Sequence, residues 1–199
     1  MSLTRRRNAV LTAVVLASLC FPVRSVLAQS PTSDSVPRLG WLHDPSVKEE
    51  YKKWLREDVV YIISDGERAD FKKLATDRER DDFVVAFWER KNPAPGSARN
   101  AYKEELYQRL AYANSNFAAG IPGWKTDRGR FYITFGPPDS VDAKPAFAPP
   151  SETWHYLFVE GIGRNVALTF TDQCLCGKYD LSGVDSDYRV PKIFEPLQY

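Results

Sequence analysis

The run from Gly123 to Asp139, GWKTDRGRFYITFGPPD, constrains the fold of this chain more than any other segment. Glycines and polar residues gather toward its two ends, where a backbone turn needs positive φ or a side chain that accepts amide hydrogens. Aromatic and β-branched residues fill the middle, which is typical of a strand. The run therefore predicts a tight turn, a strand over Arg130 to Phe135, and a second rigid turn at Gly136-Pro137-Pro138-Asp139.

Helical patterns precede this run. Asp44-Pro45 supplies a typical N-cap and first helical residue, and apolar residues then recur at helical spacing. Thr76-Asp77-Arg78-Glu79 is a capping box. Val59 to Ile63 is a continuous apolar run that fits either a buried helix end or a short extended segment, and Asp65-Gly66 is expected to break it. The helices expected are one from Pro45, one over Glu67 to Leu74, one from Thr76 to about Arg90, and one over Ala98 to Phe117.

Strand patterns follow the run. Thr153 to Val159 and Asn165 to Thr171 are rich in aromatic and β-branched residues, and Gly161-Ile162-Gly163 joins them as a hairpin. A proline-rich loop is expected over Asp142 to Pro150. Helices first and strands afterwards predict an α+β fold, with N-terminal helices (45–119) packed on a small C-terminal antiparallel sheet (130–181).

The N-terminus resembles an export signal over residues 1–28. Arg5 to Arg7 form a positive segment, Asn8 to Leu19 is apolar but short for a membrane span, and Val26-Leu27-Ala28 offers a cleavage site. An uncleaved anchor, lipidation at Cys20 and twin-arginine export are alternatives that fit the pattern less well. We expect export to the periplasm or the extracellular space, and no stable membrane span after cleavage.

Behind the signal, the sequence predicts a polar linker over 29–40, one domain over 41–185 and a C-terminal tail over 186–199. The chain has 27 basic and 26 acidic residues, and removal of the arginines in the signal would leave a slightly acidic domain. Basic residues are interleaved with acids rather than clustered, so we expect no nucleic-acid partner.

Cys174 and Cys176 are the cysteines that signal cleavage would leave. In an extended strand such a pair is about 6.6 Å apart, near the upper limit for bridged Cα atoms. A disulfide would need a turn, which Gly177 allows, and a pair of thiols is the alternative. A structural zinc site needs four ligands, and His43 and His155 each stand alone, so we expect no metal and no cofactor.

The chain resembles proteins with a GWxTD domain, through Gly123-Trp124-Lys125-Thr126-Asp127 and through segments on either side. The resemblance covers roughly Trp41 to Leu181 and implies an exported bacterial protein of a family without known function or catalytic residues. The chain departs from the family pattern after Phe170-Thr171-Asp172. Two cysteines occupy a turn that is otherwise glycine-rich, and Asp180 replaces an arginine. The C-terminal half also resembles small lipoproteins of the outer-membrane assembly machinery, as a hint about fold alone.

The residues of the motif have a structural and a chemical interpretation. In the structural one, Gly123 and Gly129 take positive φ, Asp127 closes an Asx turn, and Arg128 or Arg130 pairs with Asp127 or Asp139. The candidate binding or motif residues are Gly123, Trp124, Thr126, Asp127, Arg128, Arg130 and Asp139. In the chemical interpretation, carboxylates form a hydrolytic site. A strand of six residues would hold Asp127 and Asp139 about 20 Å apart, too far for an acid–base pair.

A hydrolase would therefore need acids that are distant in sequence, such as Asp127 with Glu152 or Asp172. No nucleophile elbow or phosphate loop appears, so we expect no catalytic residues. Core packing is the interpretation favoured for most of the aromatic residues. A few exposed ones near Trp124 and the loop over Ala143 to Pro150 could form a groove for a peptide or glycan. The interpretation favoured is a non-catalytic interaction module that binds an envelope protein or peptide, in an undetermined oligomeric state. A carboxylate hydrolase and a structural part of an outer-membrane assembly are the alternatives.

Overall fold

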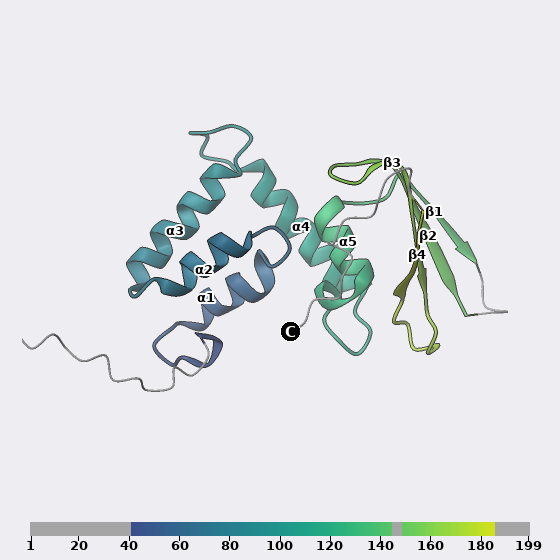
Figure 1. Cartoon of the computed structure of the whole chain (residues 1–199), viewed down its shortest axis with the longest axis horizontal. Coiled ribbons are helices and arrows are strands. Elements are labelled where there is room, and N and C mark those ends of the chain that lie inside the picture. The colour runs from purple at the N-terminus through teal and green to yellow at the C-terminus, as the bar shows by residue number, and fades with distance from the viewer. Residues whose placement is uncertain (1–40, 145–148, 186–199) are drawn as a thin grey trace, which may run out of the picture. The chain divides into compact units, whose positions relative to one another are not determined.

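The structure, a computed structural model, describes residues 41–144 and 149–185 (Figure 1). The signal segment, the linker, the C-terminal tail and part of the proline-rich loop, all predicted from the sequence, lie outside these residues. No helix within the described ranges is long and apolar enough to cross a membrane.

Helices form the first part of the described chain (Figure 1). Their bounds are α1 Glu49–Lys53, which continues into a π-helical turn at Trp54–Asp58, then α2 Asp65–Lys73, α3 Asp77–Arg90 and α4 Ala101–Asn116. Capping boxes begin α2 and α3. The hydroxyls of Ser64 and Thr76 accept the backbone amides of Glu67 and Glu79, and the backbone amides of Ser64 and Thr76 donate to the carboxylates of those glutamates. The capping box predicted at Thr76 is therefore confirmed, as are helices close to the predicted bounds of α2, α3 and α4.

Two local predictions in this part were wrong. The first helix begins at Glu49 and not at Pro45, because the carboxylate of Asp44 accepts the amide and hydroxyl of Ser46 and closes a turn there. Asp65-Gly66 does not separate the apolar run from the next helix but lies in the first turn of α2. The run from Val59 to Ile63 forms turns in which two amides donate to the carbonyl of Val59.

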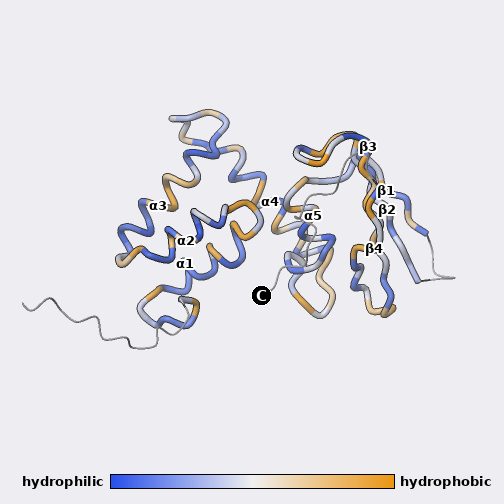
Figure 2. The backbone as a smooth tube through the Cα atoms, in the orientation of Figure 1, coloured by the Kyte–Doolittle hydropathy of each residue, from blue (hydrophilic) through white to orange (hydrophobic). Residues whose placement is uncertain are grey.

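Aromatic side chains make the core between these helices. Phe71 is fully buried, and its ring lies 4.8 Å from that of Trp54 and 5.2 Å from that of Phe83 (centroid distances). Trp41 and Tyr51 approach the same ring edge-on. Edge-to-face contacts of this kind add to the free energy gained by burial. Hydrophilic and hydrophobic stretches alternate along α3, as expected of a helix with one buried side (Figure 2).

The segment predicted as a strand over Arg130 to Phe135 is a helix. After a 3-10 turn at Gly123–Lys125, helix α5 runs over Asp127–Phe135. Thr126 is its N-cap, and Gly136, at φ 85°, ends it. Phe131 and Ile133 in this helix are buried, at 1% and 2% exposed. Packing thus outweighs a local composition that favours a strand.

The sheet has four antiparallel strands in the order β1-β2-β3-β4. Their bounds are β1 Ser140–Lys144, β2 Ser151–Val159, β3 Gly163–Thr171 and β4 Asp180–Asp185. The predicted hairpin of β2 and β3 is confirmed, with Trp154 opposite Leu168. β1 falls where a loop was expected, and β4 was not predicted. The fold class is nevertheless confirmed: the protein is α+β, with the helices before the sheet.

One face of the sheet packs against the end of α4 and against α5. The ring of Trp154 lies 5.5 Å from that of Phe117, and the ring of Phe170 lies 5.7 Å from that of Phe131. Trp154 and Phe170 also contact each other at 4.9 Å. The motif therefore lies where the helical part of the core continues into the sheet.

Candidate functional site

Thr126 fixes the start of α5. Its hydroxyl donates to the carbonyl of Gly123 over 2.7 Å and accepts the amide of Gly129 over 3.1 Å. The side chain is 3% exposed, so both bonds are sheltered from water. The Asx turn predicted at Asp127 is therefore wrong, since the threonine before it makes the cap.

Gly123 and Gly129 allow close approach and do not take the predicted positive φ. A Cβ atom on Gly123 would lie 1.9 Å from the carbonyl oxygen of Ala113 in α4. A Cβ atom on Gly129 would lie 1.8 Å from the carbonyl oxygen of Gly123. At the motif the backbone of the turn therefore packs directly against α4 on one side, at Gly123, and against α5 on the other, at Gly129.

Trp124 is a core residue and not part of an exposed aromatic groove. Its side chain is 3% exposed, its amide donates to Oδ1 of Asn114, and its carbonyl accepts the hydroxyl of Tyr61. Trp54, Trp88 and Trp154 are also buried. The structure thus gives no support to the groove predicted near Trp124, and a Trp124→Ala substitution would test folding rather than binding.

Asp127 and Arg128 fasten the sheet to α5. Oδ2 of Asp127 accepts the amide of Leu181 in β4 over 2.8 Å, and Oδ1 pairs with Arg130 at 3.3 Å. Arg128 pairs with Glu152 in β2 at 3.2 Å and donates to the carbonyl of Gly177. Its guanidinium also lies between two aromatic rings, 4.0 Å from that of Tyr179 and 5.0 Å from that of Phe117.

Asp139 binds the backbone of β2. Its carboxylate accepts the amide of Leu157 over 2.6 Å, and its own amide donates to the carbonyl of His155. Nε2 of His155 lies 3.0 Å from the carboxylate of Asp142, on the exposed side of the sheet. The estimate of about 20 Å between Asp127 and Asp139 assumed a strand and no longer applies, because a helix rises only about 1.5 Å per residue.

The acids proposed for a hydrolytic site all have structural partners. Besides Asp127, Glu152 binds Arg128 with one oxygen and the indole nitrogen of Trp154 with the other. Asp172 is 4% exposed and accepts the amides of Cys176 and Gly177 over 3.1 and 2.8 Å. A general acid or base needs an oxygen that can reach substrate. These carboxylates instead hold backbone and arginine groups in place.

Cys174 and Cys176 are joined by a disulfide, with their Cα atoms 5.2 Å apart. The turn that allows this begins at Asp172, whose role in the turn was not predicted from the sequence. An aspartate just before a Cys-x-Cys-Gly turn was the available signal. Asp172 and the two sulfurs offer ligand atoms within 4.8 Å of one another. A disulfide sulfur is not a thiolate, however, so the oxidised pair does not suit a metal.

A hollow between α3 and α4 was also missed. Its volume is about 780 Å³, and it is lined by Val84, Val85, Trp88, Glu89, Asn92, Ser97, Ala98, Arg99, Asn100, Lys103, Glu104, Tyr107 and Gln108. Lys103 lies 5.4 Å from the ring of Trp88. Burial, together with the neighbouring carboxylate of Asp58, raises the pKa of Tyr107 well above its ordinary value, so its hydroxyl stays a donor. The lining comes from two helices and the loop between them, and no local pattern in the sequence indicated how they meet.

Comparison with known proteins identifies the family. A search of curated proteins found no match, and neither did a search of solved structures. The model of the GWxTD domain matches residues 43–181. That range holds α1 to α5, the first three strands, and the contacts that Gly123, Thr126 and Asp127 make. The chain therefore belongs to the GWxTD domain family.

Proposed function

We propose that this protein is an exported, non-catalytic interaction module that binds a segment of an envelope or secreted protein in the hollow between α3 and α4. The observation that carries the proposal is the contrast between the hollow and the motif. The motif uses its polar groups inside the fold, whereas the hollow presents groups to solvent. Export is supported by the basic and apolar pattern of residues 1–28.

The lining of the hollow suits recognition of a peptide. Trp88 and Tyr107 supply an aromatic floor, and Val85, at 69% exposed, is an apolar side chain that lacks cover from the described part of the chain. Lys103 and Glu89 add charge at the rim. A central apolar surface with a polar rim is the usual anatomy of a protein interface.

A photo-crosslinking experiment tests the proposal in cells that export the protein. A photoreactive residue at Val85 is expected to trap a partner, which mass spectrometry then identifies. The same residue at Leu157 in β2 is the control, because that side chain is also 69% exposed. Equal trapping at both positions, or trapping at neither, would contradict the proposal.

With the purified partner, Val85→Glu should weaken binding at least about tenfold, whereas Leu157→Glu should leave it unchanged. Glutamate is a good helix former, so the fold of α3 should survive the change. A hydrolase is the weaker alternative, because Asp127, Glu152 and Asp172 are each bound to structural donors. A role in outer-membrane assembly remains a hypothesis from sequence likeness alone.

A further inference from the structure

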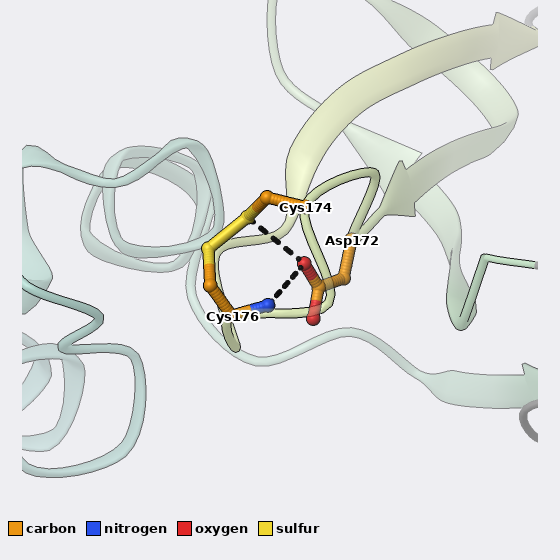
Figure 3. Close-up of side chains that lie close together, drawn as sticks. All are labelled: Asp172, Cys174 and Cys176. Atoms are coloured by element: carbon orange, nitrogen blue, oxygen red, sulfur yellow. Dashed lines mark hydrogen bonds between the residues drawn. A yellow bond between two sulfur atoms is a disulfide. The ribbon is translucent and has the colours of Figure 1, made fainter.

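The loop between β3 and β4 holds a disulfide beside a buried carboxylate. Figure 3 shows the carboxylate of Asp172 directed toward Cys174 and Cys176, which are joined by the disulfide. Sγ of Cys174 lies 3.3 Å from Oδ1 of Asp172, and the same oxygen accepts the amide of Cys176. The other oxygen accepts the amide of Gly177. The backbone of the loop is therefore held by Asp172 independently of the bond between the sulfurs.

We propose that Cys174 and Cys176 form a reversible disulfide–dithiol couple that exchanges with the dithiol of a partner protein. This inference is independent of the partner proposed for the hollow. It rests on three observations: the sulfurs are accessible, the loop keeps an anchor without the disulfide, and an acceptor for a thiol is already in place.

Accessibility comes from the position of the loop on the surface. Both cysteines are exposed, and Leu175 between them is 73% exposed. A partner thiolate can therefore reach the disulfide without unfolding the protein. Leu175 also has φ 56°, a left-handed conformation that costs free energy for a residue with a side chain. Opening the disulfide would let this residue relax.

The disulfide contributes little to holding the fold together. It closes a loop across a sequence separation of 2, and the entropy that a cross-link removes from the unfolded chain is smallest for short loops. By contrast, Asp127 holds the start of β4 through the amide of Leu181, and Arg128 holds the carbonyl of Gly177. The segment on either side of the cysteines thus stays attached when the disulfide opens.

Asp172 favours the reduced form. A disulfide sulfur carries no proton, so the 3.3 Å contact with Cys174 is a hydrogen bond only once that sulfur is a thiol. The reduced loop gains this bond, and stabilising the reduced form makes a disulfide a stronger oxidant. The carboxylate also disfavours a thiolate at Cys174, which leaves Cys176 as the better leaving group.

The exchange balances as a transfer of two electrons. A thiolate of the partner attacks Sγ of Cys174, a mixed disulfide forms, and Cys176 leaves as a thiolate that takes a proton. The second thiol of the partner loses its proton and attacks the partner's own sulfur in the mixed disulfide. Cys174 leaves, is protonated and donates to Asp172. The partner ends as a disulfide and this chain as a dithiol.

Equilibration with thioredoxin tests the proposal. The full chain, with Cys20→Ser so that two cysteines remain, is mixed in its oxidised form with an equal amount of reduced thioredoxin. Both couples are then quantified by alkylation and intact mass. We expect an equilibrium constant above about 0.1 for reduction of Cys174–Cys176 by thioredoxin. A purely structural disulfide is more stable than that of thioredoxin and would give a smaller constant. A smaller constant would overturn the proposal.

The near-ultraviolet circular dichroism of the buried tryptophans should persist through the reduction. Reduction that occurs only together with loss of this signal would also overturn the proposal. Asp172→Asn should shift the equilibrium at least about threefold toward the disulfide, since an amide oxygen accepts a thiol more weakly than a carboxylate. If Asp172→Asn does not fold, the equilibrium constant measured on the chain that keeps Asp172 still decides the proposal.

Discussion

The helical region from α1 to α3 and the sheet from β1 to β4 are stabilised in different ways. In the helical region, rings from several helices surround the fully buried Phe71. The sheet is covered on one face, and every residue of its edge strand β1 is exposed. Helix α5, against which the sheet packs, lies on the turn before it, where the backbones of Gly123 and Gly129 are in contact. The helical region therefore depends on side-chain volume, whereas the position of α5 against the sheet also depends on the absence of side chains at two glycines.

This difference implies different tolerance to substitution. An aromatic core can adjust its rotamers around a change of volume, at a cost that depends on how far it relaxes. Two backbones in contact cannot adjust without separating. The sharpest effects are therefore expected at the smallest residues, next to the sheet and not in the larger aromatic cluster.

Gly129→Ala should have the largest effect. Its methyl group would lie 1.8 Å from a backbone oxygen, so α5 would have to leave the turn and release the sheet. We expect loss of amide protection in β2 and β3 by hydrogen exchange, and a loss of unfolding free energy above about 4 kcal/mol. Gly66→Ala is the matched control. It is also a helical glycine but has open space around it, and it should stabilise by up to about 1 kcal/mol.

Phe71→Ala and Phe170→Ala compare the two cores directly. Both side chains are fully buried, one among helices and one on the sheet. Each should lose about 3–5 kcal/mol of unfolding free energy in urea titrations. Phe158→Ala, at 60% exposed, should lose less than about 1 kcal/mol. A much smaller loss for Phe170 than for Phe71 would show that the sheet packs more loosely than the rings indicate.

Thr126→Val and Thr76→Val compare an N-cap at the motif with one in the helical region. Thr126 is buried and makes two hydrogen bonds with the backbone, so we expect a loss of about 2–3 kcal/mol. Thr76 is exposed, and loss of its cap should cost about 1 kcal/mol. Thermal unfolding measures both. Thr126→Ser keeps the hydroxyl and should recover most of the loss, and equal losses at the two caps would remove the distinction.

Acid should lower the stability of the helical region, and this effect should be smaller than those of the substitutions above. The backbone amide of Thr76, which donates to Glu79, lowers the pKa of that carboxyl below 4.5. The stability that the ionised Glu79 contributes is complete above pH about 4.5. It is lost as the pH falls through the lowered pKa of Glu79 in the folded protein. Glu79→Gln should reduce the acid dependence of the melting temperature. Glu160→Gln, an exposed change at the hairpin, is the control, and an equal effect there would contradict the assignment to the cap.

Much of the helical region could be predicted because its signals are local. Thr76 and Glu79 are three residues apart, and their exchange of hydrogen bonds needs nothing from the rest of the chain. The hairpin of β2 and β3 was equally legible, since Gly161-Ile162-Gly163 separates two aromatic runs. The start of the first helix differs from the prediction because Asp44 accepts a local hydrogen bond from Ser46.

The motif itself was misread because its helix is stabilised from outside. Most residues of α5 from Gly129 to Phe135 are poor helix formers, and burial of Phe131 and Ile133 outweighs their preference. Thr126 followed by an acid was an N-cap signal, but the aromatic residues after it indicated a strand. β1 and β4 lack apolar alternation, and their pairing with β2 and β3 is non-local. The hollow at Trp88 likewise depends on how two helices meet.

The contact between Gly129 and the carbonyl of Gly123 requires a fixed number of residues between them in this chain. A helix advances by about 100° per residue, so one residue inserted after Thr126 would turn Gly129 away and bring a side chain against that oxygen. The five letters that name the family thus stop short of the physical unit, which ends at Gly129. A protein that carries the five letters without the later glycine is expected to hold the following helix farther from its turn.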